Sequence, residues 1–369
     1  MRTYKVFAIN PGSTSTKIAL FEGEKAIFSA NVSHDAAKLE EFIDISEQLP
    51  YRKEKILNLL EESNISLKGT DAFVGRGGGL FSMEGGTYEI DDLLLDHARR
   101  GINGVIHPAQ LGSQLAEGFR IEFGGKGFVV NPPDVDEMQD VARMTGIKGV
   151  YRMIHLHALN LKETAIRHAA SIGKKYEDCN FIVCHIGGGI SVSAHKKGRM
   201  IDGFDIVGGE GPMAPTRCGS VAVADLLKYA SNKNLKDIKS ICTKNGGFVS
   251  HMGVSDAIEV FERGQSGDKY AKMVWNSMIY QIEKSIGAMT TVLQGKIDGI
   301  LLGGGMVHNN NLVRQIRDAC EWIAPISTYP GEFEMEAMAA GAIRVLSGEE
   351  SVKHYLGKPA WEGFDFSNE

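Results

Sequence analysis

The stretch that decides the fold lies near the start of the chain and reads V-F-A-I-N-P-G-S-T-S-T-K from Val6 to Lys17. Its pattern returns in F-I-V-C-H-I-G-G-G-I-S-V, from Phe181 to Val192, where Gly187 aligns with Gly12 at an offset of 175 residues. In both stretches a short apolar run ends at glycine and small polar residues before a second apolar run begins. This pattern predicts two strands joined by a tight turn.

A second glycine turn follows each stretch at the same spacing. Gly23 and Gly198 also lie 175 residues apart, and each precedes a further run with strand character, at residues 26–30 and 200–204. Each half of the chain is therefore predicted to begin with a three-stranded meander. Both halves later carry an aspartate, an apolar run and a glycine cluster, in residues 71–79 and 298–305. These matches indicate an internal duplication.

Helical periodicity fills the segments between these strands. The predicted helices include residues 51–63, 91–100, 136–145, 157–171 and 270–293. We expect Asp134 to cap the third of these helices, and Gly101 and Gly146 lie where helices should stop. Helices that alternate with short strands indicate an α/β protein.

Glycine accounts for 44 of the 369 residues, and three of its clusters, at residues 75–79, 187–189 and 303–305, follow short apolar runs. Tight turns are the simpler interpretation of such clusters, whereas the functional interpretation is that backbone amides face phosphates. No G-x-x-x-x-G-K-[ST] motif occurs, and no G-x-G-x-x-G opens a helix after the first strand. A P-loop and a Rossmann site are thereby excluded, so a nucleotide would have to bind by another architecture.

Two halves that each begin with a meander and a glycine turn resemble the actin-like ATPase superfamily, which includes sugar kinases and heat-shock chaperones. The resemblance implies a duplicated, ribonuclease H-like α/β fold with two domains and a nucleotide cleft between them. In that plan the two hairpin turns hold the nucleotide phosphates. We expect domain I to span residues 1–155 plus 335–369, and domain II to span residues 156–334.

Composition excludes several other classes of protein. The chain has 40 Lys+Arg and 46 Asp+Glu, a net charge of −6 and no basic block, so neither nucleic acid nor an anionic membrane is an expected partner. No apolar run is long enough to cross a bilayer, and no secretory leader is expected. Five cysteines without a C-x-x-C pair indicate reduced thiols and predict a cytoplasmic protein.

The first glycine turn is rich in polar side chains. Asn10, Ser13, Ser15 and Thr16 offer amide or hydroxyl groups that can bind phosphate oxygens, and Lys17 adds a positive charge. A solvated turn without a ligand is the alternative. Because an isolated hairpin rarely needs so many hydroxyl groups, we interpret this turn as a candidate phosphate site.

Two arginines lie among glycines, one in each half of the chain. Arg76 occurs in V-G-R-G-G-G and Arg217 in A-P-T-R-C-G, and a planar guanidinium suits a carboxylate or a phosphate. His107 and His157 precede helix-like stretches, but their spacing does not distinguish a functional histidine from a structural one. His155 and His157 form an H-x-H pair that lacks a third ligand at a metal-binding spacing.

An ordered set of motifs makes the resemblance more specific. From Val6 to Leu346 the set runs N-x-G-S-T-S-T-K, G-R-G-G, I-H-P, V-D-E-M, V-A-R, H-A-L-N, H-I-G-G-G-I-S-V, E-G-P, R-x-G, G-G-G-M and Y-P-G-E. In this order the motifs resemble the acetate/butyrate kinase (acetokinase) family over nearly the whole chain. H-A-L-N, E-G-P and Y-P-G-E are closest to the butyrate kinase branch of that family.

The resemblance implies phosphate and nucleotide contacts at glycine turns of both halves. The family's first phosphate turn corresponds to Asn10, Ser13, Ser15, Thr16 and Lys17. Its second phosphate loop corresponds to His185, Gly187, Gly188 and Gly189. Its adenosine side corresponds to Gly303, Gly304 and Gly305.

The same resemblance implies catalytic roles for individual side chains. Arg76 and Arg217 fall on the two arginines that hold the acceptor carboxylate and the transferring phosphoryl group. His157 falls on the histidine thought to stabilise the transition state, and His107 is expected on the substrate side.

A Mg²⁺ site is also implied, with one departure from the family pattern. Glu332 falls on a carboxylate associated with the metal, and Glu334, two residues away, is the alternative. The family usually has aspartate where this chain has Asn131, which keeps a carbonyl oxygen but no charge. We keep Asn131 among the expected catalytic residues and regard Asp134 or Asp136 as an alternative metal ligand.

The activity implied is a kinase that transfers phosphoryl from ATP directly, in line, to a short-chain carboxylate, with ADP as the other product. Butyrate is the expected acid, while acetate, propionate and branched-chain acids stay open. A kinase for a sugar or another alcohol and a nucleotide-gated scaffold protein are the rival classes. A homo-oligomer, either a dimer or a larger assembly, is expected.

Overall fold

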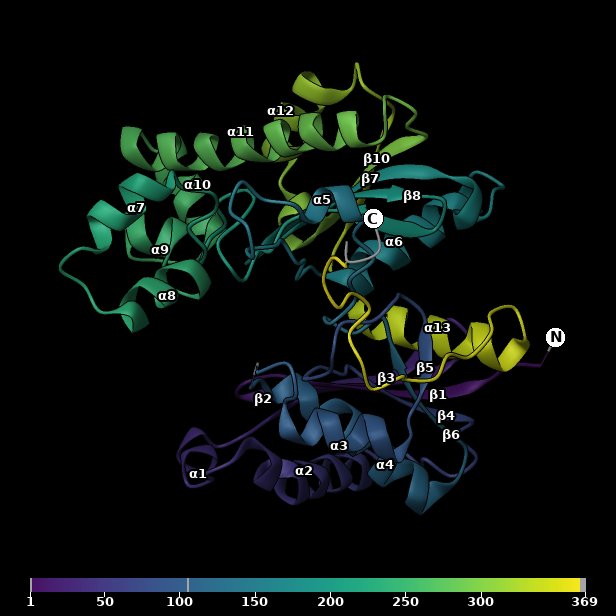
Figure 1. Ribbon diagram of the computed structural model, residues 1–369. Helices are drawn as coiled ribbons and strands as arrows, with labels where there is room; N and C mark the ends of the chain where they lie inside the picture. The colour runs from purple at the N-terminus through teal and green to yellow at the C-terminus, as the bar shows by residue number, and fades with distance from the viewer. Residues whose placement is uncertain (1, 105, 366–369) are drawn as a thin grey trace. The chain divides into compact units, whose positions relative to one another are not determined.

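The chain folds into two units, which the computed structural model describes over residues 2–104 and 106–365 (Figure 1). Unit 1 comprises Met1–Asp136 and Phe333–Glu369, and unit 2 comprises Glu137–Glu332. Met1, Val105 and residues 366–369, which belong to the predicted domain I, lie outside the described residues.

Unit 1 ends earlier than residue 155, the boundary that the sequence predicts. The segment after Asp136 belongs to unit 2 because its hydrogen bonds go there. The backbone N–H of Gln139 donates to the carbonyl of Ile201, and Arg152 pairs with Asp202 at 3.3 Å and with Glu210 at 2.8 Å.

A six-stranded sheet with the order β3-β2-β1-β4-β6-β5 forms the centre of unit 1. Strands β1, β2 and β3 make an antiparallel meander, β4 and β6 run parallel to β1, and β5 is an antiparallel edge strand. The strands span Lys5–Pro11 (β1), Ser15–Glu22 (β2), Lys25–Ser33 (β3), Ala72–Gly75 (β4), Thr87–Glu89 (β5) and Lys126–Val130 (β6).

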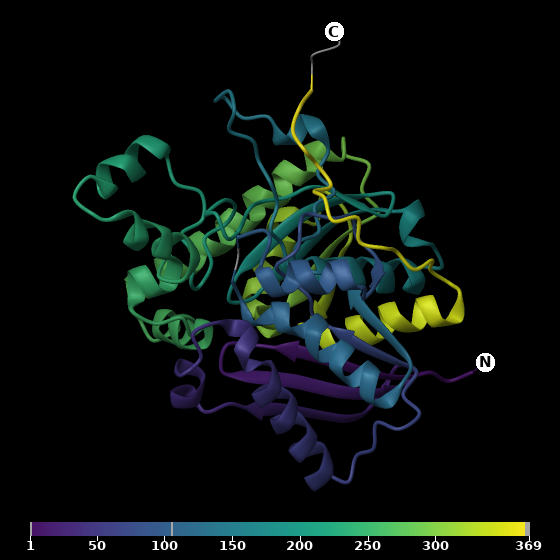
Figure 2. The ribbon, with the colours of Figure 1, turned by 60° about the horizontal axis from the view of Figure 1, so that its bottom comes forward.

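Helices cover both faces of this sheet, with α2, α3 and α4 on one side and α13 on the other (Figures 1 and 2). Phe7 of β1 and Phe119 of α4 pack edge to face, with ring centroids 5.5 Å apart, in the core between sheet and helices. The helices of unit 1 are α1 (Ala36–Glu40), α2 (Gln48–Glu62), α3 (Asp92–Arg100), α4 (Leu111–Phe123) and α13 (Glu334–Ser347), with short 3₁₀ turns at Ile45–Glu47 and Pro108–Gln110.

Unit 2 is built on a five-stranded sheet with the order β11-β10-β7-β8-β9. The meander β7-β8-β9 is antiparallel, and β10 and β11 run parallel to β7. The strands span Asn180–Ile186 (β7), Ile190–Lys196 (β8), Arg199–Asp202 (β9), Gly299–Gly304 (β10) and Ile326–Pro330 (β11).

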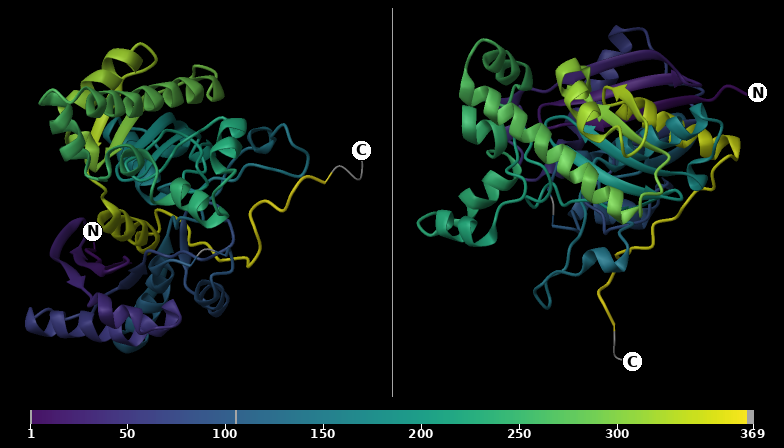
Figure 3. Two further views of the ribbon diagram at one scale, coloured as in Figure 1. Left: turned by 90° about the vertical axis from the view of Figure 1, so that its left-hand side faces the viewer. Right: turned by 90° about the horizontal axis from the view of Figure 1, so that it is seen from above.

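The long helix α11 runs across the sheet of unit 2, and α6 covers the opposite face (Figures 1 and 3). Helices α9 and α10 pack against α11, whereas α7 and α8 contain no buried residue. The helices of unit 2 are α5 (Asp140–Arg143), α6 (Ala158–Ser171), α7 (Val223–Ala230), α8 (Leu235–Thr243), α9 (Gly247–Met252), α10 (Ala257–Gln265), α11 (Lys269–Val292) and α12 (Asn310–Cys320), with 3₁₀ turns at Tyr176–Asp178 and Gly305–His308.

The predicted duplication is present, because β1-β2-β3-β4 and β7-β8-β9-β10 have the same order and directions. Gly12 and Gly187 each follow the last residue of the first strand of their meander. Gly23 and Gly198 lie in corresponding turns, but their positions within those turns differ by one residue. Pro11 pairs with Thr16 across the first turn, but Ile186 pairs with Ile190, so the second turn is one residue shorter.

The aspartate that recurs in both halves makes the same backbone contact in each. The Asp71 carboxylate accepts from the backbone N–H of Lys5 at 2.8 Å, and the Asp298 carboxylate accepts from that of Asn180, also at 2.8 Å. Each aspartate therefore ties the loop before a parallel strand to the first residue of the meander beside it.

Most predicted helices are confirmed, but the one over residues 136–145 is wrong. Only Asp140–Arg143 is helical, with Gln139 as its N-cap, so Asp134 caps no helix and Gly146 ends none. Gly101, in contrast, is a left-handed C-cap of α3 with φ 58°. Within the described part of the chain, no helix is both long and apolar enough to cross a membrane. All five cysteines are free thiols.

Candidate functional site

The candidate site of unit 1 is built on the turn between β1 and β2. Ser13 is exposed on this turn and Ser15 is half-buried, while the Gly12 N–H donates to the Ser15 carbonyl at 2.7 Å. Lys17 is exposed at the start of β2. The serines and the lysine can thus reach a ligand at the surface of the turn.

Thr16 is placed differently from the prediction. Its side chain is fully buried, and its hydroxyl lies 2.8 Å from His34 Nε2 and accepts from Arg52 at 3.1 Å. The hydroxyl therefore holds the turn from behind, and we withdraw Thr16 as a phosphate ligand. A threonine on a strand points to one face or the other, and the sequence alone does not say which.

Arg52 of α2 is the main support of this turn, and sequence reasoning missed it. It is fully buried and donates to the backbone carbonyls of Gly12 at 2.9 Å, Ser13 at 3.2 Å and Ser15 at 3.3 Å. Burial lowers the pKa of Arg52 to about 10. A buried cation behind the turn satisfies its carbonyl oxygens and adds positive potential at a place where an anion can bind.

Arg76 lies at the end of β4, beside the end of β1. Its Nε is 3.6 Å from a carboxylate oxygen of Glu334, whose other oxygen accepts from Asn10 Nδ2 at 2.6 Å. The backbone N–H of Arg76 donates to the Ile9 carbonyl at 3.0 Å, which fixes where the side chain begins. Unit 1 therefore gathers an arginine, an amide and a carboxylate at one edge of its sheet.

Two glycines allow this arrangement. A Cβ on Gly75 would lie 2.1 Å from the carbonyl oxygen of Gly112 in α4, and a Cβ on Gly112 would lie 2.6 Å from the backbone nitrogen of Arg76. Strand and helix backbones thus touch directly below the arginine.

Three predicted residues of unit 1 have structural partners in this fold. Asn131, at φ 39°, accepts from the Gly86 N–H through Oδ1 at 2.7 Å, and its carbonyl accepts from Arg76 at 3.5 Å. The Asp134 carboxylate accepts from Asn103 at 2.7 Å, and His107 Nδ1 accepts from the Ala109 N–H at 3.1 Å. Through these hydrogen bonds the three residues hold loops of unit 1 in place.

The candidate site of unit 2 is built on the turn Gly187–Gly189 between β7 and β8. His185, the next-to-last residue of β7, is 4% exposed, and its ring stacks on that of His157 with centroids 4.0 Å apart. His157 Nδ1 lies 2.9 Å from Ser191 Oγ on β8. The structure thus brings together both predicted histidines of this unit and the glycine turn.

Arg217 completes this cluster. A Cβ on Gly189 would lie 1.8 Å from Arg217 Nη1 and 3.2 Å from His157 Cε1, so the guanidinium lies directly against the glycine turn. Its Nε and Nη1 are buried and have no hydrogen-bond partner among the described residues. Burial lowers the pKa of Arg217, an effect that Asp205 opposes. Buried donors of a cation that have no protein partner are suited to bind an anion.

The turn that carries Arg217 is braced by the start of α9. Gly246 N–H donates to the Thr216 carbonyl at 3.1 Å, and a Cβ on Gly247 would lie 1.6 Å from the Ala214 carbonyl oxygen. Only glycine fits at position 247, where φ is 56°.

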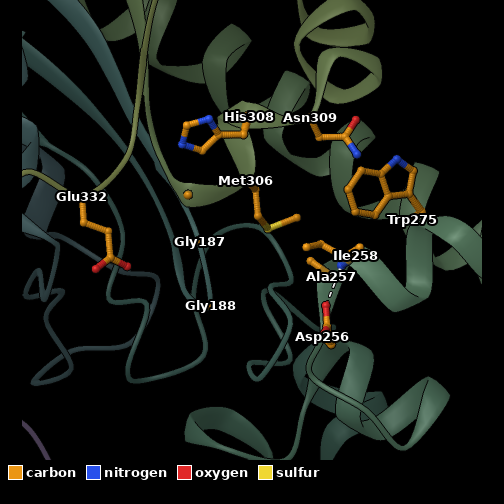
Figure 4. Close-up of a pocket in the computed structure, with 11 residues that line it drawn as sticks. Gly187, Gly188, Asp256, Ala257, Ile258, Trp275, Met306, His308, Asn309 and Glu332 are labelled. Atoms are coloured by element: carbon orange, nitrogen blue, oxygen red, sulfur yellow. Dashed lines mark hydrogen bonds between the residues drawn. The ribbon is translucent and has the colours of Figure 1, made fainter. Parts of the chain in front are cut away.

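A pocket of 430 Å³ opens beside the second turn (Figure 4). Its lining comes from the glycine turn, from α10 and α11, and from the residues after β10 and β11: Gly187, Gly188, Asp256, Ala257, Ile258, Trp275, Gly305, Met306, His308, Asn309 and Glu332. Met306, Ile258 and Trp275 provide apolar surface, and Trp275 Nε1 is a buried donor without a partner among the described residues. The volume is in the range of small-molecule sites.

Of the predicted adenosine-side glycines, Gly305 lines this pocket, whereas Gly303 and Gly304 do not. A Cβ on Gly304 would lie 2.4 Å from the Ile186 carbonyl oxygen, so this glycine permits β10 to approach β7. Apart from the glycines, Met306 of G-G-G-M and Glu332 of Y-P-G-E, the lining residues lie in no motif, and the sequence offered no signal for them.

Asn10 and Glu334 are the residues of unit 1 whose chemistry suits a Mg²⁺ ion. They supply an amide oxygen and a carboxylate side by side, and Mg²⁺ accepts one or two carboxylates while keeping its waters. Glu332 instead lines the pocket of unit 2. Within residues 2–104 and 106–365 no group of three or more His, Cys, Asp or Glu side chains is arranged for a metal.

Comparisons with a family model and with known proteins agree on one family. A family model described as the Acetokinase family matches residues 148–351. Butyrate kinase 2 of Clostridium acetobutylicum is 43% identical over 358 residues, covering 95% of this chain and 99% of the relative. A probable butyrate kinase of Clostridium botulinum strain Alaska E43 is 41% identical over 355 residues, covering 96% of this chain and 100% of the relative.

A solved structure agrees at the level of the fold. The acetate kinase of Porphyromonas gingivalis has a TM-score of 0.74 to this chain, with 20% identity and coverage of 93% of this chain and 100% of that chain. This likeness confirms the predicted fold class, which is a duplicated actin-like α/β fold.

Proposed function

This chain belongs to the acetokinase family, and we propose that it transfers the γ-phosphoryl group of ATP reversibly to the carboxylate of butyrate. The products are butyryl phosphate and ADP. We propose butyrate because relatives named as butyrate kinases are 41% and 43% identical over nearly the whole chain.

The observation that carries the proposal is the guanidinium of Arg217, whose Nε and Nη1 are buried. Two of its nitrogens have no partner among the described residues, and it lies against Gly189 and His157. An arginine in this state is suited to the charge that accumulates on a transferring phosphoryl group. We therefore assign Arg217, His157, His185 and the turn Gly187–Gly189 to the phosphoryl group.

The chemistry needs positive charge more than a proton acceptor. A short fatty acid is ionised at neutral pH, as carboxyl groups with a pKa near 4 are. Its oxygen attacks the γ-phosphorus, the bond from phosphorus to the β,γ-bridging oxygen breaks, and the electron pair leaves with ADP. We assign Arg76 to the acceptor carboxylate, and Ser13, Ser15 and Lys17 to phosphate oxygens.

Asn10 and Glu334 would hold Mg²⁺, which when bound neutralises negative charge on the phosphates. Of the two glutamates that the sequence leaves open, we choose Glu334 because it is hydrogen-bonded to Asn10 and lies 3.6 Å from Arg76. Asp134, already bonded to Asn103 and the Leu80 N–H, is not proposed as a ligand.

We assign the 430 Å³ pocket to the nucleoside of ATP. It adjoins Gly187 and Gly188, so a nucleoside there leaves its phosphates next to the glycine turn. The apolar side chains of Met306, Ile258 and Trp275 suit the faces of a flat base.

A hydroxylamine trap tests the reaction. With ATP, Mg²⁺, hydroxylamine and butyrate, the enzyme should form butyryl hydroxamate, because only an acyl phosphate gives this product. Acetate, propionate, isobutyrate and isovalerate belong in the same panel, since one methylene discriminates by only about 1–3 kcal/mol. The highest kcat/KM is expected with butyrate.

Two outcomes would contradict the proposal. Phosphorylation of a sugar or another alcohol without hydroxamate would assign the protein to the alcohol kinases. Tight retention of ADP without any carboxylate-dependent turnover would indicate a nucleotide-gated scaffold.

We further propose a cytoplasmic homo-oligomer. The free thiols of all five cysteines suit a reducing compartment. Sedimentation velocity of the purified protein and fractionation of the cells that produce it test the two parts separately.

A further inference from the structure

A buried asparagine on α6, Asn160, joins two parts of unit 2 that are far apart in the sequence. Its Oδ1 lies 2.8 Å from His185 Nδ1 on β7, and its Nδ2 donates to the backbone carbonyl of Glu332, after β11. Asn160 is 2% exposed and His185 is 4% exposed, so water cannot substitute freely for either bond.

The orientation of the Asn160 amide follows from this network. A carbonyl oxygen can only accept, so the NH₂ group of Asn160 must face Glu332, and Oδ1 must face His185. The hydrogen in the bond between Asn160 Oδ1 and His185 Nδ1 is therefore carried by His185 Nδ1.

The hydrogen bond to Asn160 also determines where the other ring nitrogen of His185, Nε2, lies. A Cβ on Gly187 would lie 3.1 Å from His185 Nε2, so this nitrogen lies next to the first residue of the glycine turn. The ring also stacks on His157, with an interplanar angle of 21°. Any rotation of His185 would therefore disturb both the turn and the second histidine.

We propose that Asn160 is a positioning residue that sets the tautomer and rotation of His185, and through the stacked rings the rotation of His157. An asparagine suits this role better than an aspartate, because a neutral acceptor fixes the imidazole without adding negative charge where phosphate binds. The inference rests on the proposed function for what the histidines do during transfer, but the tautomer can be measured without substrate.

The first test is the hydrogen position on His185, read by ¹⁵N NMR of the full chain with labelled histidine. A His185→Gln variant identifies the signal. The wild type should carry the hydrogen on Nδ1, and Asn160→Leu should move the population toward the Nε2–H form. A wild-type hydrogen on Nε2, or an unchanged tautomer in Asn160→Leu, would overturn the proposal.

The second test is kinetic. Asn160→Leu should lower kcat about 10- to 100-fold, as loss of the outer hydrogen-bond partner does for histidines that bind a metal, while KM for butyrate stays unchanged. Thr164→Val is the matched control, because Thr164 lies one turn along α6, is 2% exposed, and its hydroxyl has no hydrogen-bond partner among the described residues. Its kcat should equal that of the wild type.

Asn160→Asp gives an answer even if the leucine variant does not fold. It keeps the acceptor for His185, but it replaces the donor to the Glu332 carbonyl by a carboxylate oxygen and adds a negative charge. The Nδ1 hydrogen should therefore stay, while KM for ATP rises about tenfold or more. An unchanged KM would show that position 160 is not coupled to the phosphate turn. Should the wild type lack carboxylate-dependent turnover, the proposed function fails, and the NMR result still decides the role of Asn160.

Discussion

At the scale of single residues, Arg217 differs from most arginines in that two of its nitrogens are buried without a partner among the described residues. Such a group is costly to keep unless an anion completes its hydrogen bonds. Such a group suits a place where a charged ligand comes and goes, as we propose for the phosphoryl group.

Arg217→Ala should lower kcat/KM about a thousandfold or more, as loss of a transition-state arginine does in phosphoryl transfer. The fold should persist, because the variant leaves no new buried donor without a partner. Arg314→Ala is the control, since Arg314 is exposed on α12 of the same unit. Steady-state kinetics and circular dichroism measure both; wild-type turnover in Arg217→Ala would remove the role assigned to it.

His34, which contacts Thr16 behind the first turn, should make stability depend on pH. Burial, together with Arg52 and Lys55, lowers the pKa of His34 to about 4, against about 6.5 in an unfolded chain. Between these values only the unfolded chain binds the proton, so the free energy of unfolding falls as the pH decreases from about 6.5 to about 4. Urea unfolding across this window should show a weaker pH dependence for His34→Gln than for the wild type; parallel curves would contradict the assignment.

Some of these residues could be predicted from the sequence and others could not. Arg76 and Arg217 lie among glycines, which is a local signal. Arg52 and Asn160 act through partners far along the chain, Gly12 and Glu332 among others, and a helix residue gives no local sign of such contacts. Thr16 was misplaced for the same reason, because only the packing shows which side its hydroxyl faces.

At the scale of elements, the closest contact in unit 1 is between β4 and α4. Gly75 and Gly112 meet there without side chains, directly below the backbone of Arg76. The position of the arginine thus depends on two glycines that make no contact with a ligand themselves.

Gly112→Ala should destabilise the protein by about 1–3 kcal/mol, because the new Cβ would lie 2.6 Å from the Arg76 nitrogen. It should also lower kcat/KM, since relief of the clash displaces Arg76. Gly118→Ala, on the same helix, is the matched control: its Cβ meets only the Lys53 side chain at 3.7 Å, so we expect unchanged or slightly higher stability. Thermal unfolding of both variants measures the two changes in stability. Equal changes in Gly112→Ala and Gly118→Ala would refute the packing argument.

Element boundaries show where periodicity fails as a guide. The helix over 91–100 was predicted well because Asp91 and Gly101 cap it at its two ends. The helix over 136–145 was not, because this segment is held by bonds to distant residues, such as that from Gln139 to Ile201. Tertiary contacts override weak helical periodicity there.

At the scale of the whole chain, the duplication is the feature that the sequence predicted best. The meander and the parallel strand beside it recur in both units, and Asp71 and Asp298 make the same backbone contact in each. The pocket could be predicted only in part, because its glycines lie in the repeated motifs but the residues from α10 and α11 do not. The resemblance to the acetokinase family is confirmed over nearly the full chain.

The central claim is that a carboxylate oxygen bonds directly to the γ-phosphorus, and ³¹P NMR of the product from ¹⁸O-labelled butyrate tests it most directly. With ATP, Mg²⁺ and the labelled acid, the phosphorus signal of butyryl phosphate should show the isotope shift of one bonded ¹⁸O. An acyl phosphate without that shift, or a product in which no phosphorus is bound to the acid, would contradict the account.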